Sequence, residues 1–228
     1  MIPLSVLLLA DSRLPSGSHA HSGGVEMAVT DGLLSTVDDL DLFLRGRLRT
    51  AGPVAAGFAA VAALLAEQGA RSWQVWDEAL SARTPAPALR DASRAQGAAL
   101  LRTVSRIWPG PVVSALRELG RPHQLLVLGA AVAAGGGGAA DAAALAVHHL
   151  IGGACSAAIR LLGLDPIEVA AVHGAVAESA GRLAGASVGL AELAVSTSDP
   201  SILPATSAPL PELLAVRHAE MEVNLFAS

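Results

Sequence analysis

The stretch QLLVLGAAVAAGGGGAADAAALAVHHLIGGACSAAIRLL, residues 124–162, decides the fold class of this chain. Its apolar residues recur with a helical period, and small residues are frequent enough to let helices approach closely. Four consecutive glycines, residues 135–138, divide the stretch into two segments, and Asp141 is the only formal charge between Arg121 and Arg160. The pattern predicts two core helices, near residues 124–134 and 139–163.

The low charge of this stretch raises the question of a membrane span. The glycines interrupt it, and Asp141, His148 and His149 fall within the second segment. We therefore expect each half to be too short for the roughly 20 apolar residues that a span needs. The sequence predicts buried helices and no association with a membrane.

The helical period continues outward along the chain, and strand-like runs are nearly absent. Thr36 followed by Asp39 resembles a capping box, and Asp165-Pro166 combines an N-cap with a proline at the first helical position. Further helices are predicted to begin at Pro53 and Pro211. Others are predicted near 71–82, 87–107, 112–119 and 183–196. The loop 197–210 is predicted to be mobile. Together these segments predict an all-α fold, with residues 1–228 forming a single globular domain of about ten helices.

Composition narrows the possible partners and the compartment. Hydrophobic residues make up 52% of the chain and charged residues only 15%, which suits a protein that also buries surface against partners. The net charge of −5 argues against nucleic acid as a partner. The apolar N-terminus, residues 1–13, lacks a basic region and a cleavage motif, and Cys155 is the only cysteine. We expect a cytoplasmic protein.

The segment LPSGSHAHSGGVE, residues 14–26, is the strongest candidate for a functional site. It lacks the spacing of a phosphate-binding loop, and the chain contains no lysine. In an extended segment His19 and His21 would lie on one side and could share a metal ion, although no third ligand is evident nearby. No motif for nucleophilic catalysis accompanies the serines. The residues therefore predict no enzyme and no cofactor, and leave a packed turn and a weak metal site as alternatives.

Four groups of residues, in order along the chain, resemble the urease accessory protein F family. The first is Leu14-Pro15-x-Gly17 followed by Ser22-x-Gly24-x-Glu26. The others are Leu89-Arg90 with Ser93, Gly97 and Leu100, then Ala157-x-x-Arg160-Leu161, and finally His218 with Leu225-Phe226-x-Ser228. The chain departs from the family pattern at His19-Ala20-His21, at Gly163-Leu164-Asp165-Pro166 and at Asn224, where the family has arginine.

The resemblance implies a non-catalytic, all-α homodimer. Such a protein would bridge the urease accessory GTPase (protein G) and accessory protein D/H, regulate the GTPase step, and support nickel insertion into apo-urease. The resemblance also implies the partner-binding residues, which are Leu14, Pro15, Gly17, Ser22, Gly24, Glu26, Arg160, His218, Leu225, Phe226 and Ser228.

Two points stay open on the sequence alone. Arg160, if buried, needs a negatively charged partner, which could be Asp141 or an acidic residue of a second subunit. The alternative function is that of a nickel-binding metallochaperone that uses His19 and His21.

Overall fold

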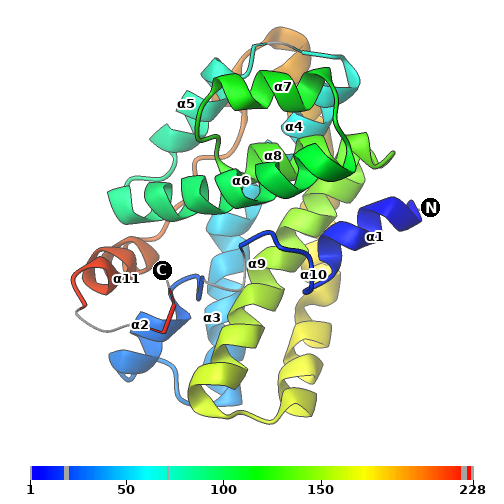
Figure 1. Ribbon diagram of the computed structural model, residues 1–228. Helices are drawn as coiled ribbons and strands as arrows, with labels where there is room; N and C mark the ends of the chain where they lie inside the picture. The colour runs from blue at the N-terminus through cyan, green and yellow to red at the C-terminus, as the bar shows by residue number, and fades with distance from the viewer. Residues whose placement is uncertain (1, 18–20, 71, 222–224, 227–228) are drawn as a thin grey trace.

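Eleven α-helices and one short 3-10 helix account for the secondary structure of the residues that the computed structural model describes (Figure 1). The described residues are 2–17, 21–70, 72–221 and 225–226. Within these ranges no β-strand forms, so the predicted all-α class is confirmed. The helices are α1 (Leu4–Ala10), α2 (Val25–Thr30), α3 (Val37–Arg49), α4 (Ala51–Glu67), α5 (Gln74–Ala82), α6 (Pro87–Ile107), α7 (Pro111–Glu118), α8 (Gln124–Ala134), α9 (Ala139–Leu162), α10 (Pro166–Thr197), η2 (Pro200–Ile202) and α11 (Pro209–Ala219).

Helix α4 lies at the centre of the core and packs against α8, α9 and α10. Its middle is almost entirely buried because its residues are small and apolar, from Gly52 through Ala63. Close approach to α8 depends on Gly129, where a Cβ atom would overlap the carbonyl oxygen of Ala59. Short side chains therefore bring the backbones of α4 and α8 near one another, while larger side chains such as Phe58 and Trp73 fill other parts of the core.

Helix α9 contradicts the expectation that each half of 124–162 is too short to span a membrane. It is continuous over 24 residues and is long and apolar enough to cross a bilayer, so the segment after the glycines is not too short. The bent pair α3 and α4, inclined at 50°, also passes this test. However, 56% of the apolar window in α9 is buried inside the protein, where it packs on α4, α8 and α10. We interpret α9 as a core helix, as the sequence predicted.

The helix boundaries follow the capping residues closely at two places. Thr36 and Asp39 form a reciprocal capping box at the start of α3, and the side chain of Asp165 accepts a hydrogen bond from the amide of Ile167 at 2.8 Å. The predicted starts at Pro53 and Pro211 are each two residues too late, because α4 begins at Ala51 and α11 at Pro209. A proline is compatible with any position in the first turn, so it marks a start only approximately.

The predicted helix near 183–196 is instead the second half of α10, which runs unbroken over 32 residues. The loop that follows is held in place rather than free. The guanidinium group of Arg83 donates hydrogen bonds to the carbonyl oxygens of Pro200, Leu203 and Pro204, at 2.7, 3.0 and 2.9 Å. Leu203 is buried in the core. The prediction of a mobile loop is therefore wrong for this part of 197–210.

Candidate partner-binding site

The described start of the segment 14–26, residues 14–17, lies against α6, and its end enters α2. Leu14 is buried, and the carbonyl oxygen of Pro15 accepts a hydrogen bond of 2.7 Å from the Thr103 hydroxyl of α6. Gly17 has φ +78°, a left-handed conformation that suits glycine, and a Cβ atom there would lie 3.0 Å from the Cβ of Ala99. The predicted tight turn is thus confirmed at Gly17.

The same segment ends at the start of α2. Gly24, with φ +92°, is the N-cap of this helix, and Ser22 is fully buried beside it. Glu26 lies in the first turn, where a negative charge is favoured by the helix dipole. The left-handed turn at Gly24 therefore directs the Glu26 side chain into the protein instead of toward solvent.

Glu26 joins the two ends of the chain. Its carboxylate is buried and accepts hydrogen bonds from the Nε2 of His218 at 2.7 Å, the amide of Leu225 at 2.6 Å and the amide of Phe226 at 3.1 Å. Helix α11, which carries His218, packs beside α2 (Figure 1). We call Glu26, His218, Leu225 and Phe226 the tail joint.

The electrostatics of the tail joint favour an ionised Glu26. Burial raises the pKa of this carboxyl, but the hydrogen bonds from His218, Leu225 and Phe226 together outweigh burial and leave the pKa below its ordinary value. An ionised carboxylate only accepts hydrogen bonds, so the Nε2 of His218 must carry the hydrogen. At neutral pH, Glu26 therefore stabilises the docked tail as an anion.

The ring of Phe226 makes a second contact that holds the C-terminal residues in place. Its ring is buried, and the guanidinium carbon of Arg160 lies 4.4 Å from the ring centroid, which is cation–π geometry. Arg160 is exposed rather than buried. Asp141 is not its partner in this chain, because Asp141 caps the opposite end of α9 through a hydrogen bond of 3.1 Å from the amide of Gly138.

The structure thus brings together five of the eleven predicted partner-binding residues. Glu26, Arg160, His218 and Phe226 touch through the tail joint, while Leu225 projects outward with 73% of its surface exposed. On α11, Leu210, Leu213 and Val216 are also exposed. Ser228 lies outside the described residues.

The predicted metal pair is only partly described. His19 lies outside the described residues, and His21 is partly buried, with a pKa lowered by burial and by the nearby His218. Among the residues that the structure describes, no three His, Cys, Asp or Glu side chains are grouped so as to hold a metal ion. The use of His19 and His21 in nickel binding stays a prediction.

Sequence reasoning missed several polar contacts between distant segments. His148 and His173, which were not predicted to meet, lie on α9 and α10 with ring centroids 5.4 Å apart. His123 is fully buried and bonds to the hydroxyls of Ser81 and Ser93, both at 2.9 Å. No local pattern distinguishes such residues from solvated histidines.

Cys155 carries the only thiol of the chain. It is buried on α9, and burial raises the pKa of its thiol to about 11. Because the thiolate is the reactive form of cysteine, a thiol with this pKa is unsuited to nucleophilic chemistry at neutral pH.

Comparison with known proteins agrees with these features. Residues 34–177 match the family model UreF. The chain belongs to the UreF family. It is 43% identical to the urease accessory protein UreF of Mycobacterium sp. (strain JLS), over 98% of both chains. It is also 41% identical to the proteins of the same name from Mycobacterium marinum and Mycobacterium tuberculosis (strain H37Rv), over the full length of each.

Membership of the UreF family defines the general role. This UreF chain is a urease accessory protein, and the family is not catalytic, so the chain is not an enzyme. The family model ends before α11, and the tail joint is covered only by the full-length relatives. The family resemblance identified from the sequence motifs is therefore confirmed.

Proposed function

We propose that this protein is a cytoplasmic scaffold of urease maturation that acts as a homodimer. It binds the urease accessory GTPase (protein G) and accessory protein D/H, regulates the GTPase step and supports nickel insertion into apo-urease. The observation that carries the proposal is the tail joint, at which the two family motifs farthest apart in the chain meet. Full-length similarity to urease accessory proteins supports the same role.

The tail joint suits a protein that binds partners. Glu26 and Arg160 hold the backbone and the ring of Phe226, so the C-terminal end is positioned without using the side chain of Leu225. That leucine is left exposed, as are Leu210, Leu213 and Val216 of α11. Exposed apolar side chains are frequent in protein-binding faces. We assign this face to accessory protein D/H or to protein G.

Co-expression provides the test. The tagged chain is produced with the D/H and G proteins from the same genome, and the purified complex is sized by light scattering. We expect a complex in which this chain is a dimer and both partners are present in equal copy number. Failure to capture either partner would refute the bridging role while leaving the fold unaffected.

A matched pair of variants assigns the binding face. Leu225→Asp places a charge on the exposed tail, and Leu42→Asp does the same on α3, where the leucine is 69% exposed. Both variants should fold, because neither side chain is buried. We expect only Leu225→Asp to lose capture of a partner, and equal capture by the two variants would remove the tail from the interface.

Regulation of the GTPase step requires a kinetic measurement. The rate of GTP hydrolysis by protein G is measured alone, with the wild-type complex and with the Leu225→Asp complex. We expect the wild-type complex to change the rate, and the variant to leave it as in protein G alone. An unchanged rate in the intact wild-type complex would restrict this chain to a bridging role.

A further inference from the structure

Two histidines from different helices come together where α9 packs on α10. His148 of α9 is exposed, and His173 of α10 is half-buried. Their ring centroids lie 5.4 Å apart, and the ring planes are inclined at 33°. The two helices pack directly against each other. The pair therefore joins two core helices at a place that solvent can reach.

The pair forms because α9 leaves room for the ring of His173. Residues 148 and 152 are one turn apart and lie on the same face of α9, and residue 152 is a glycine. A Cβ atom at Gly152 would lie 3.9 Å from the Cε1 of His173, so this ring lies over Gly152 and beside His148. A side chain longer than that of alanine at position 152 would occupy the space of the ring.

The ring nitrogens of both histidines are available to a ligand. Among the residues that the structure describes, no hydrogen bond or ion pair engages either ring, and the nitrogens of the half-buried His173 are not shielded from solvent. Burial lowers the pKa of His148, and burial together with the nearby His148 lowers the pKa of His173. Both rings are therefore neutral at neutral pH, which is the form that binds metal ions.

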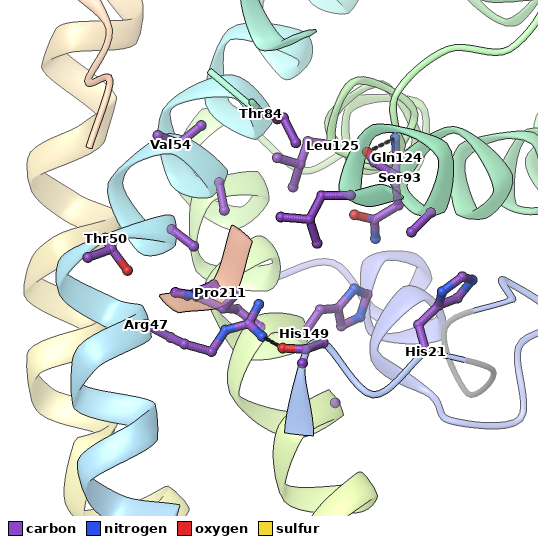
Figure 2. A pocket seen from close by; sticks show the side chains of 18 of the residues that line it. His21, Arg47, Thr50, Val54, Thr84, Ser93, Gln124, Leu125, His149 and Pro211 are labelled. Carbon is purple, nitrogen blue, oxygen red and sulfur yellow. Dashed lines mark hydrogen bonds between the residues drawn. The ribbon is translucent and has the colours of Figure 1, made fainter. Parts of the chain in front are cut away.

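The other histidines nearby are placed differently. His149 lines a cavity of about 290 Å³ together with Arg47 (Figure 2). The Nε2 of His149 lies 3.0 Å from the carbonyl oxygen of Leu9, and its Nδ1 is shielded from solvent, so neither nitrogen is available. His21 and His148 both line a smaller cavity of about 180 Å³. However, no third His, Cys, Asp or Glu of the described chain is grouped with two others so as to hold a metal ion.

The geometry of the pair suits a divalent metal ion that prefers imidazole. An imidazole nitrogen lies about 2.0–2.1 Å from bound Zn²⁺ and the ring centre about 1 Å beyond it, so two rings on one tetrahedral ion have centres about 5 Å apart. The 5.4 Å between the rings of His148 and His173 is close to this value. Imidazole suits Zn²⁺, Cu²⁺ and Ni²⁺, whereas Mg²⁺ and Ca²⁺ prefer oxygen ligands.

We propose that His148 and His173 together bind a divalent transition-metal ion, with water molecules as the remaining ligands. The ion links α9 to α10 at the surface of the protein. The site uses neither the residues of the tail joint nor His19 and His21. It also requires no partner protein, so its test is independent of the function proposed above.

The first test is a titration of the folded wild-type protein with ZnCl₂ at neutral pH, observed through the ¹⁵N resonances of the histidine rings. We expect the signals of His148 and His173 to shift together and to saturate at the same Zn²⁺ concentration. MgCl₂ should leave both signals unmoved. If neither ring or only one ring responds to Zn²⁺, or if Mg²⁺ has the same effect, the two rings are only in contact and the proposal is wrong.

Variants then assign the ligands. His148→Ala and His173→Ala should each weaken Zn²⁺ binding at the remaining ring by at least about tenfold, because the loss of even an indirect partner of a metal ligand typically costs about 10- to 100-fold in affinity. The His19→Ala and His21→Ala double variant is the matched control, since it removes two imidazoles but neither member of the pair. It should leave the Zn²⁺ response of His148 and His173 unchanged. Equal weakening by the double variant would overturn the assignment to α9 and α10.

Discussion

Glu26→Gln tests how the C-terminal tail is held. The carboxylate accepts hydrogen bonds from the amides of Leu225 and Phe226, and a bond to a charged acceptor contributes about 1.5–3 kcal/mol. A glutamine keeps one carbonyl oxygen, which can still accept one of these hydrogen bonds. A hydrogen bond between neutral groups contributes about 1 kcal/mol. The expected loss of tail docking is therefore about 2–5 kcal/mol. A loss of this size corresponds to roughly a 30- to 4,000-fold change in an opening equilibrium.

Hydrogen exchange measures this opening directly. The amides of Leu225 and Phe226 should lose protection in Glu26→Gln, while amides of the core helix α4 should change little, because the tail can open without global unfolding. Glu178→Gln is the matched control, since Glu178 is 86% exposed and pairs only with Arg182. Unchanged protection of the two tail amides in Glu26→Gln would refute the role of the carboxylate.

The pH dependence of the tail follows from the same carboxyl. The pKa of Glu26 is lower in the docked state than in the free chain, so its contribution is complete above the ordinary glutamate pKa and is lost as the pH falls through the lowered value. We expect the Phe226 amide resonance to be constant near neutral pH and to shift on acidification below about pH 4. Glu26→Gln should abolish this transition, and a transition that survives the substitution would assign it to another group.

Three further changes test the core and the metal hypothesis. Gly129→Ala should destabilise the protein by about 2 kcal/mol or more in chemical denaturation, because the new methyl group overlaps α4. Gly189→Ala, with open space at the Cβ position, should be neutral or stabilising by up to about 1 kcal/mol. Asp77→Ala should cost about 3–5 kcal/mol in the same assay, since it removes one partner of a largely buried ion pair. A His19→Ala and His21→Ala double variant should abolish calorimetric nickel binding if the metallochaperone hypothesis holds, and unchanged binding would refute it.

Local sequence signals predicted most of the helices. The capping box at Thr36 and the N-cap at Asp165 are formed by residues close in sequence, so no tertiary information was needed to recognise them. The errors at Pro53 and Pro211 have a local cause as well, because a proline fits any position in the first turn. The break expected before residue 183 did not occur, since Gly181 is tolerated within a helix when its neighbours continue the pattern.

The candidate site depended on contacts that no local pattern encodes. The motifs around Glu26 and Phe226 were each recognised through a family resemblance, but their meeting across 200 residues of chain was not predicted. Arg47 was not singled out from the sequence, and His149 was considered only as a residue of the predicted core helix near 139–163. Only the packing of α3 against α9 places both at one cavity.

The sequence by itself determined the all-α class and most helix positions, because these depend on short-range periodicity and capping. It also determined the family, because the family motifs are short stretches of residues along the chain. The tertiary structure alone decided which polar groups are buried and what they contact. Burial is a property of helix packing, and it converts Glu26 from a helix-start residue into the anchor of the tail. The same packing leaves the Nε of Arg47 and the Nδ1 of His149 unsatisfied inside the protein.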